Sequence, residues 1–315
     1  MAKEILRMED VTKIYDNGFV ANKNVTFWLH ESEILALVGE NGAGKTTLMK
    51  VLFGLETPQT GKVYMDGKEV KILNTLDAIE KGIGMVHQHF MLIPSLTVAE
   101  NVVLGVEPMK NGLFDFKKAV EMTEEVAKKY NFNIDPMARV SDLSVGQMQK
   151  IEIMKVLIKG AKIIIMDEPT AVLTPQETEE LFEQLILLRN SGHSIIFISH
   201  KLEEVKRICT RVTVLRHGYC LGSYDLKDMS EADISRLMVG RDVVLKIEKE
   251  DPTVGKTVLK IRNLVKNSAS GKRVLDDVSF DIHEGEVIGI AGVEGNGQSA
   301  LSDVLAGMES FSSGT

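Results

Sequence analysis

The residues best suited to chemistry lie in one glycine-rich segment near the start of the sequence. That segment has the G-x-x-x-x-G-K-[ST] spacing of a phosphate-binding loop and reads Gly39-Glu40-Asn41-Gly42-Ala43-Gly44-Lys45-Thr46-Thr47. Glycines let the backbone turn its N–H groups toward phosphate oxygens. Lys45 offers a positive charge to the β- and γ-phosphates of a nucleotide, and Thr46 offers a hydroxyl group to Mg²⁺. The pattern therefore predicts a nucleotide site that includes a magnesium ion.

Two acidic residues follow a later apolar run, residues 163–166, and are the next candidates. Aspartate often ends an apolar strand as the cap of the next helix, which is the structural interpretation of this pattern. A phosphate-binding loop earlier in the chain favours a chemical role instead. We expect Asp167 to be a partner of Mg²⁺ and Glu168 to be the base that activates water.

Three further residues have a structural and a chemical interpretation, and the sequence pattern leaves both open. Gln88 ends a short strand-like run, where it either caps the strand or reaches Mg²⁺ and the attacking water. His200 also ends a buried run; a lone histidine there is often structural, but this run is expected beside the acidic one. Tyr15 precedes a turn at residues 16–18 and either packs at a sheet edge or stacks on a nucleotide base.

The strands that must position these residues follow from the hydrophobic pattern. Four short apolar runs are typical of buried strands in a parallel sheet, at residues 33–38, 84–88, 163–168 and 195–200. Residues 3–38 before the loop, 54–87 after it and 210–225 predict additional antiparallel strands and hairpins. The helix that follows the loop adds unpaired N–H groups and its dipole to the phosphate site. The predicted fold class is α/β.

Residues 97–160 are expected to be mostly helical. Thr97 followed by Glu100 is a capping-box pattern that marks a helix start. The charged residues of segment 117–130 are most simply the solvated face of an amphipathic helix. Ser144 opens a turn of small residues before another helical pattern that runs to Lys159. The start of this last helix again offers free N–H groups to an anion.

Composition excludes several classes of protein. The 315 residues carry a net charge of −8, which is unfavourable for sequence-independent binding of nucleic acid, and we expect no nucleic-acid partner. The two cysteines, Cys209 and Cys220, lack metal-ligand spacing and fit a reducing compartment. Residues 1–7 lack the apolar core of a signal peptide. No run approaches the roughly 18 apolar residues of a membrane span, so we expect any membrane part to belong to another chain.

The sequence begins to repeat itself in its last quarter. A shift of 253 positions aligns Val278–Gly314 with Val25–Gly61 without a gap and with 14 identities in 37 positions. Gln298 stands where the first copy has Lys45 and cannot supply a positive charge, whereas Ser299 keeps the hydroxyl group at the next position. We therefore expect any nucleotide binding by the second loop to be weak.

The repeat predicts the domain organisation. We expect a first domain at residues 1–240, with a helical subdomain at about 90–155, and an incomplete second domain at residues 257–315. Residues 241–256 are charged, contain Pro252 and lack periodicity, as expected of a linker. A partial α/β unit has too little apolar surface to bury its own core. The second domain is therefore expected to be poorly ordered or to lean on the first.

Taken together, these motifs resemble the ATPase subunit of ABC transporters over the whole chain. The matching motifs are Walker A (Gly39–Thr46), the Q-loop (Gln88), the LSGGQ signature (Leu143–Gln147), Walker B (Ile163–Glu168), the D-loop (Ala171–Thr174) and the switch histidine (His200). The resemblance implies a P-loop ATPase fold, in which a RecA-like core carries an antiparallel β subdomain and an α-helical subdomain. Two departures stand out. Val145 replaces a glycine and is expected to tighten or block the approach to a partner's γ-phosphate, and Thr174 replaces an aspartate.

The resemblance also implies a role for each matching residue. ATP is expected to be bound by Tyr15, Gly39, Asn41, Gly42, Ala43, Gly44, Lys45, Thr46 and Thr47. The catalytic residues are expected to be Glu168, His200 and Gln88, and the ligands of Mg²⁺ are expected to be Thr46, Gln88 and Asp167. ATP held by a partner domain is expected to be contacted by Ser144, Gly146 and Gln147.

Two ATPase domains in one chain, the second with an altered Walker A motif, resemble the sugar and nucleoside importer group. Residues 84–92, 238–241 and 291–298 look most like the nucleoside branch. The resemblance implies two membrane permease subunits, an indirect substrate-binding lipoprotein and a peripheral location on the cytoplasmic face of the plasma membrane. Two copies of the chain would pair through their first domains. The alternatives are a nucleotide-binding fragment without efficient turnover and a soluble ABC protein outside transport.

Overall fold

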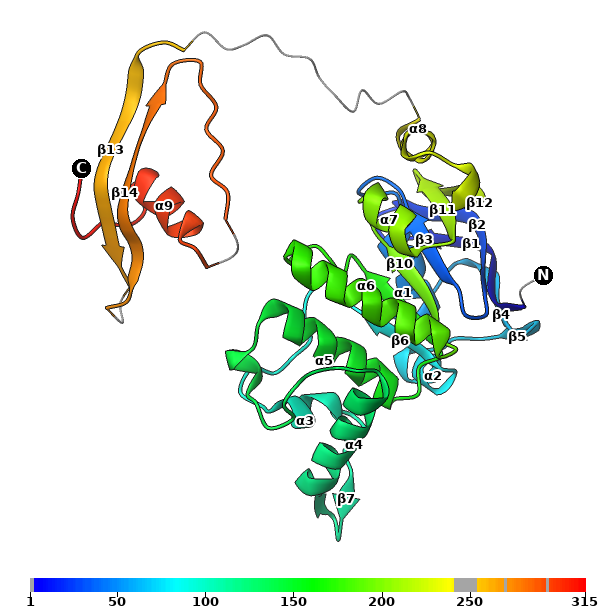
Figure 1. The fold of residues 1–315 in the computed structure, drawn as a ribbon. Coiled ribbons are helices and arrows are strands. Elements are labelled where there is room, and N and C mark those ends of the chain that lie inside the picture. Colours follow the sequence, from blue (N-terminus) through cyan, green and yellow to red (C-terminus); the bar gives the residue numbers. More distant parts are fainter. Residues whose placement is uncertain (1–2, 241–253, 269–270, 293–294) are drawn as a thin grey trace. The chain divides into compact units, whose positions relative to one another are not determined.

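The computed structural model describes residues 3–240, 254–268, 271–292 and 295–315 (Figure 1). The chain divides into two units, Met1–Val243 and Val244–Thr315. Most of the predicted linker, residues 241–253, lies outside the described residues.

A six-stranded sheet forms the centre of the first unit. Its strand order is β12-β11-β3-β10-β9-β6, with the bounds β3 Ile34–Val38, β6 Ile83–Val86, β9 Ile163–Asp167, β10 Ser194–Ile198, β11 Arg211–Arg216 and β12 Tyr219–Asp225. All neighbours are parallel except β11 and β12. Every residue of β3, β6, β9 and β10 is buried, which is why these strands are continuous apolar runs in the sequence. The predicted buried parallel sheet is confirmed.

A second sheet of the first unit, which is antiparallel, shares an apolar core with the parallel sheet. Its order is β2-β1-β4-β5, with the bounds β1 Glu4–Ile14, β2 Val20–His30, β4 Thr60–Met65 and β5 Lys68–Val70. Helix α1 (Lys45–Leu52) shares an apolar cluster with both sheets, in which Leu48 and Met49 join Phe27 of β2 and Leu37 of β3. Because α1 is buried in this way, the glycine-rich loop before it is fixed at both ends.

Besides α1 and the helices between β6 and β9, the first unit has helices that cover the parallel sheet. They are α2 (Thr75–Glu80), α6 (Pro175–Asn190), α7 (Leu202–Ile208) and α8 (Glu231–Val239). Phe182 of α6 meets Phe197 of β10 edge to face, with ring centroids 6.3 Å apart. Thr174 accepts a hydrogen bond from the N–H of Glu177 and caps the start of α6. Helix α2 was not predicted, although Asn74 caps it through the N–H of Asp77.

A separate helical part follows strand β6 in the chain and consists of α3 (Val98–Val102), α4 (Phe116–Lys129) and α5 (Val145–Ile158) (Figure 1). The predicted capping box of Thr97 and Glu100 is confirmed. The expectation of a mostly helical segment is wrong at one place, because β7 (Met109–Lys110) and β8 (Leu113–Phe114) form a hairpin. Its turn residues Asn111 and Gly112 have φ of 53° and 80°, the geometry for which Asn-Gly is the usual sequence signal.

The second unit contains an antiparallel pair, β13 (Thr257–Asn267) and β14 (Arg273–His283), and helix α9 (Gln298–Leu305). Four apolar side chains are buried together: Ile261, Leu264, Leu275 and Leu301. A small core therefore exists, against the expectation that this partial unit cannot bury one. None of the helices in the described ranges combines the length and the apolar character that crossing a bilayer requires.

The segment of the second unit that aligns with β3 behaves differently from β3. Residues 286–292 form no strand, and Val287 is 96% exposed. In the first unit β3 is paired on both sides, by β10 and β11, and the described part of the second unit contains no counterpart of either strand. The same apolar pattern therefore becomes a strand only where neighbours cover its backbone groups.

Candidate functional site

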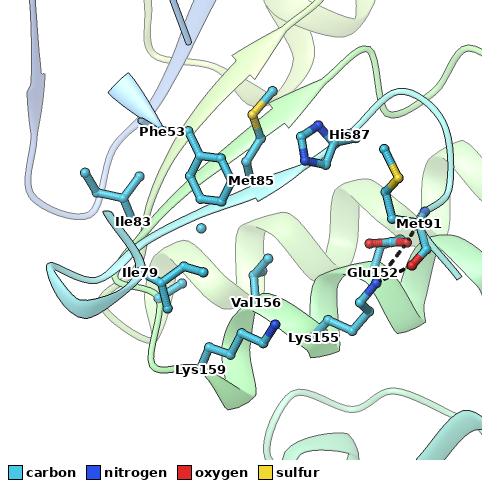
Figure 2. A pocket seen from close by; sticks show the side chains of 12 residues that line it. Phe53, Ile79, Ile83, Met85, His87, Met91, Glu152, Lys155, Val156 and Lys159 are labelled. Carbon is cyan, nitrogen blue, oxygen red and sulfur yellow. Dashed lines mark hydrogen bonds and ion pairs between the residues drawn. The ribbon is translucent and has the colours of Figure 1, made fainter. Parts of the chain in front are cut away.

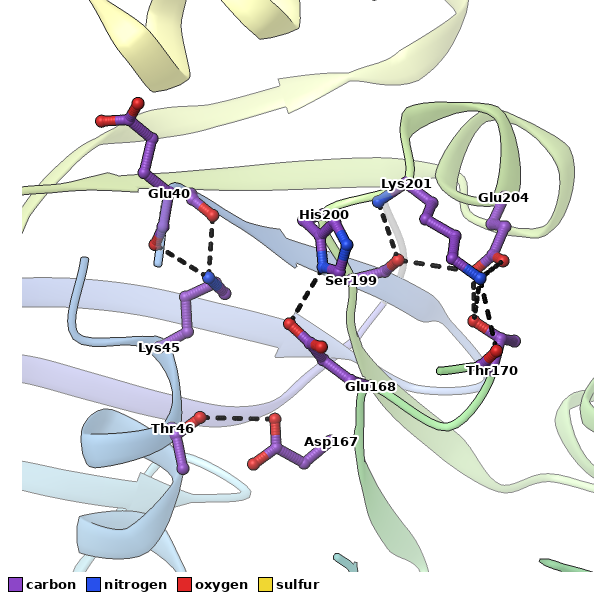
Figure 3. A network of polar contacts seen from close by, with 11 residues as sticks. Glu40, Lys45, Thr46, Asp167, Glu168, Thr170, Ser199, His200, Lys201 and Glu204 are labelled. Atoms are coloured by element: carbon purple, nitrogen blue, oxygen red, sulfur yellow. Dashed lines mark hydrogen bonds and ion pairs between the residues drawn. The ribbon is translucent and has the colours of Figure 1, made fainter. Parts of the chain in front are cut away.

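The parallel sheet brings the predicted chemical residues to one edge. Strand β10 lies between β3 and β9, and parallel neighbours end on the same side. The glycine-rich loop follows β3, Asp167 ends β9 and Glu168 follows it, and His200 follows β10. Figure 3 shows Lys45 and Thr46 facing these strand ends. Residues that are about 120 positions apart in the sequence thus become neighbours, as Thr46 and Asp167 do across their hydrogen bond.

Two glycines of the loop, Gly39 and Gly44, are required by close packing. A Cβ atom at Gly39 would lie 2.3 Å from the backbone oxygen of Leu215. Gly44 has a φ of 97°, and a Cβ atom there would lie 2.3 Å from the backbone oxygen of Ala21. The amide of Asn22 donates to the backbone oxygen of Gly44 at 3.1 Å. The neighbouring strands therefore hold the loop in a conformation that only glycine permits at Gly39 and Gly44.

The ammonium group of Lys45 is held inside the loop. Its Nζ atom donates to the backbone oxygens of Gly39 at 2.7 Å and Glu40 at 3.0 Å (Figure 3). Burial lowers the pKa of Lys45, and the charges of Glu168 and Asp167 oppose this effect. A positive charge that is partly desolvated and bonded only to neutral carbonyl oxygens is well placed to receive phosphate oxygens.

Thr46 and Asp167 form the second contact of the site. The hydroxyl of Thr46 donates to Oδ1 of Asp167 at 3.4 Å, and Asp167 is only 4% exposed. Burial raises the pKa of Asp167, while the Thr46 hydroxyl acts in the opposite direction. A buried carboxylate next to a hydroxyl is a set of hard oxygen donors, so these residues fit Mg²⁺ that also takes phosphate and water ligands.

Glu168 and His200 form the third contact. Nδ1 of His200 lies 3.1 Å from Oε1 of Glu168, with the imidazole as donor because a carboxylate only accepts. Glu168 has a φ of 47°, unusual for a residue with a side chain. Its N–H donates to the backbone oxygen of Ile198 at 3.1 Å. The backbone thus leaves the strand direction at Glu168 and is held there by β10.

A hollow of about 380 Å³ lies in front of the glycine-rich loop. It is lined by Phe19, Ala21, Asn41, Gly42, Ala43, Gly44, Lys45, Thr46, Thr47, Gln88 and Glu168. The fold thus brings Gln88 and Glu168 to the same space as the loop. Tyr15 does not line the hollow, but its hydroxyl lies 3.2 Å from Oγ1 of Thr47. Phe19 does line it and was missed, although it is an aromatic residue directly after the predicted turn.

The signature residues lie elsewhere, at the start of α5. Ser144 caps this helix and forms a capping box with Gln147. None of Ser144, Gly146 and Gln147 lines the hollow, as expected if they serve a nucleotide on another domain. Glu177 of α6 reaches them: its Oε1 accepts from the N–H of Gly146 at 3.0 Å and from the hydroxyl of Ser144 at 3.3 Å. Glu177 was not predicted as a site residue, because its only motif signal was that of a helix start.

A network of hydrogen bonds around Glu204, which was also not predicted, links the segments after β9 and β10. Oε2 of Glu204 accepts from the hydroxyls of Thr170 at 2.7 Å and Ser199 at 3.4 Å (Figure 3). Lys201 lies 3.0 Å from the other oxygen of Glu204. Because Thr170 and Ser199 flank Glu168 and His200 in the chain, this network supports the third contact.

Comparison with known proteins agrees with this geometry. Residues 22–171 match the family profile described as ABC transporter. A glucose import ATP-binding protein of Haloferax volcanii is 44% identical over 98% of this chain and 61% of its own length. A guanosine import ATP-binding protein of Bacillus subtilis is 45% identical over 99% of this chain and 61% of its own length. A nucleoside import ATP-binding protein of Lactococcus lactis is 43% identical over 100% and 62%. The chain thus spans about three fifths of the length of these relatives.

Solved structures give the same result. An ATP-binding cassette of an ABC transporter in its ADP conformation has a TM-score of 0.66 and 25% identity, covering 76% of this chain and 97% of its own. A dimeric cassette in a post-hydrolysis state, bound to ADP and Pi, has a TM-score of 0.61 and 27% identity, covering 71% and 100%. The predicted P-loop ATPase fold is confirmed. Residues 22–171 therefore match the ABC transporter family profile, and the first unit has the fold of the ATP-binding cassettes of such transporters.

Proposed function

We propose that this chain is the ATP-binding and ATP-hydrolysing subunit of an ABC importer for nucleosides or sugars. The observation that carries the proposal is the meeting of the glycine-rich loop, Asp167, Glu168 and His200 at one edge of the parallel sheet. The names of the relatives, which import glucose, guanosine and nucleosides, support the substrate class.

The phosphates of ATP would lie against the loop. The backbone N–H groups at the start of α1 and the ammonium group of Lys45 would bind the phosphate oxygens. Thr46, Asp167 and Gln88 would hold Mg²⁺, which when bound supplies neutralisation of phosphate charge. Tyr15 and Phe19 are the aromatic residues near the loop that would meet the base. The role of each of these residues is part of the proposal.

Hydrolysis requires an acceptor for the proton of water and stabilisation of the γ-phosphate. Glu168 would orient or deprotonate the water, and His200 would contact the γ-phosphate. The 3.1 Å contact between the two side chains holds the carboxylate in place before ATP arrives. The loop, held by its packing against neighbouring strands, supplies donors that need no rearrangement during the reaction.

A complete site would need two domains. We propose that two copies pair through their first units, so that Ser144, Gly146 and Gln147 of one copy reach the ATP held by the other. The dimeric state of the solved cassette with ADP and Pi supports this arrangement. The loop of the second unit is a weaker alternative, because it carries Gln298 in place of a lysine.

Membrane permease subunits would complete the importer, and we propose that they dock at a second hollow, beside the segment that follows Gln88 (Figure 2). This hollow has a volume of about 160 Å³. Its lining combines apolar and charged side chains: Phe53, Ile79, Ile83, Met85, His87, Met91, Glu152, Lys155, Val156 and Lys159. With such partners the chain would be peripheral, on the cytoplasmic face of the plasma membrane, and a substrate-binding lipoprotein would take part indirectly.

At the second hollow, the segment that follows Gln88 is hydrogen-bonded to helix α5, and both belong to the proposed ATP site. Oε1 of Glu152 accepts from the N–H of Met91 at 2.6 Å, and Nζ of Lys155 donates to the backbone oxygen of Met91 at 2.6 Å (Figure 2). Both side chains belong to α5, which begins at the signature. A permease segment in this hollow would therefore press on the link between the Gln88 segment and α5.

Two measurements test the proposal. ATP hydrolysis by the purified chain should rise per molecule as protein concentration rises, because pairing completes each site. A rate that stays near zero at every concentration, with ATP still bound, would favour the nucleotide-binding fragment. Co-purification with permease subunits should separate an importer from a soluble ABC protein, which would not retain them.

A further inference from the structure

The carboxylate of Glu177 occupies the start of helix α5. Its Oε1 accepts from the N–H of Gly146 at 3.0 Å and from the hydroxyl of Ser144 at 3.3 Å. Its Oε2 accepts from the N–H and the hydroxyl of Thr174, both at 3.0 Å. One side chain thus joins the signature to the segment that caps α6.

The fit around this carboxylate is close. A Cβ atom at Gly146 would lie 2.6 Å from Oε1 of Glu177, so only glycine lets the carboxylate approach. Burial tends to raise the pKa of Glu177, but the hydrogen bonds from Thr174, Gly146 and Ser144 outweigh it and hold the pKa below its usual value. The group at the start of α5 is therefore an anion at neutral pH.

A phosphate oxygen would seek the same donors. The unpaired N–H groups and the dipole at a helix start favour an anion, and the hydroxyl of a neighbouring serine is an additional donor. In this structure Glu177 uses the hydroxyl of Ser144 and the N–H of Gly146. A phosphate and a carboxylate cannot share them, because both are negatively charged and both only accept.

We infer that Glu177 is an internal competitor for the phosphate that an opposing domain presents to the signature. This inference rests on the proposed function, in which Ser144 and Gly146 of one copy reach ATP on the other. Closing of the pair must displace Glu177 from Gly146. Since Glu177 also holds Thr174, its release loosens the cap of α6 at the same moment. Glu177 is a positioning residue that sets how much ATP is needed for pairing.

Glu177→Gln tests the inference with little change in shape. Glutamine has one carbonyl oxygen and can serve Thr174 or Gly146, but not both. It remains a favourable capping-box residue, so the cap of α6 is kept and Gly146 is freed. Glu180→Gln is the matched control, because it removes a charge one turn further along α6, where Glu180 pairs with Lys150 at 2.8 Å.

The experiment uses the full chain in a Glu168→Gln background, so that ATP-bound pairs accumulate. The mass of the complex is followed by sedimentation while MgATP is titrated. Glu177→Gln should lower the ATP concentration for half-maximal pairing by about fivefold or more, the usual lower range for coupled sites. Glu180→Gln should change it by less than about twofold, as exposed ion pairs usually contribute little.

The outcomes distinguish a failure of this inference from a failure of the proposed function. An unchanged or higher ATP concentration for half-maximal pairing in Glu177→Gln would overturn the inference. Loss of a contact with a purely structural role would weaken pairing and would not strengthen it. A fall in Tm without nucleotide together with tighter pairing would support it. If the Glu168→Gln parent neither binds ATP nor pairs, the proposed function fails first.

Discussion

Nδ1 of His200 lies 3.1 Å from Oε1 of Glu168, across the ends of two neighbouring parallel strands. The two residues are 32 positions apart in the sequence. Their contact is set by the sheet, because β10 and β9 pair in register up to Ile198 and Asp167. The carboxylate is 18% exposed and the imidazole is 51% exposed, so both face the solvent side of the strand ends.

Glu168→Gln should keep ATP binding and lose turnover. Removing a general base typically costs about 10²- to 10⁴-fold in rate, while the phosphate donors of the loop remain. Steady-state phosphate release and equilibrium ATP binding measure the two effects. Undiminished hydrolysis would remove Glu168 from this role. His200→Ala should lower the rate less, and the double variant should lose little more than Glu168→Gln alone, because both changes remove one contact.

Lys45→Gln should abolish most of the stabilisation by ATP, because it places in the first loop the residue type found at position 298. A ligand at 100 times its Kd raises the free energy of unfolding by about 2.7 kcal/mol. Thermal denaturation with and without MgATP measures this gain. Lys50→Ala, on the same helix but away from the hollow, is the control and should keep the gain. An equal shift in both variants would contradict the role of Lys45.

Gly44→Ala should be strongly destabilising. A methyl group at this left-handed residue would lie 2.3 Å from a backbone oxygen, and we expect a loss of about 2–4 kcal/mol. Gly67→Ala is the control for conformation alone, since its φ is 76° and no atom lies within 4 Å of the added methyl group. It should cost about 1–2 kcal/mol. Urea unfolding compares them, and similar losses would mean that the loop can relax.

Asp167→Asn should stabilise the nucleotide-free protein at neutral pH. Burial raises the pKa of Asp167, so the folded protein holds the proton more tightly than the unfolded chain. The charged form therefore costs stability above the raised pKa, and this cost disappears as the pH falls toward the ordinary value of 3.8. At pH 7 the variant should gain roughly 2–4 °C in Tm, on the order of 1 kcal/mol.

The control for Asp167→Asn is Asp225→Asn, whose side chain is 54% exposed. It should leave Tm nearly unchanged at both pH 7 and pH 4.5. A lower Tm of Asp167→Asn at pH 7 would contradict this prediction, because it would show that contacts in the folded protein offset the cost of burying the charged carboxylate. Loss of magnesium-dependent ATP binding in the same variant would support Asp167 as a ligand of the ion.

A glutamate-specific protease should cut the second unit before the first. Glu286 follows β14 and precedes an exposed segment that forms no strand. Its counterpart in the first unit, Glu33, is 7% exposed and pairs with Arg211 at 3.0 Å. Cleavage after Glu286 should be at least about tenfold faster, because local opening is required at Glu33. Mass spectrometry of early fragments identifies the site, and equal rates would contradict the difference in packing.

Several features were determined by the sequence alone. The loop from Gly39 to Thr46 is recognisable because its chemistry depends on residue types at fixed local spacing. The strands that end at Asp167 and at Ile198 are recognisable because strands buried on both faces are continuous apolar runs. The hairpin at Asn111 and Gly112 also had a local signal, which the expectation of a helical segment overrode.

Only the tertiary structure decided which of these features meet. The position of β10 between β3 and β9 places His200 beside Glu168, and strand order depends on packing between distant segments. The approach of Glu177 to Gly146 likewise requires α6 to pack on α5. Residues 286–292 show the same limit, since a strand-like pattern needs neighbours to pair its backbone. Local spacing determined the chemistry, and long-range packing determined where it takes place.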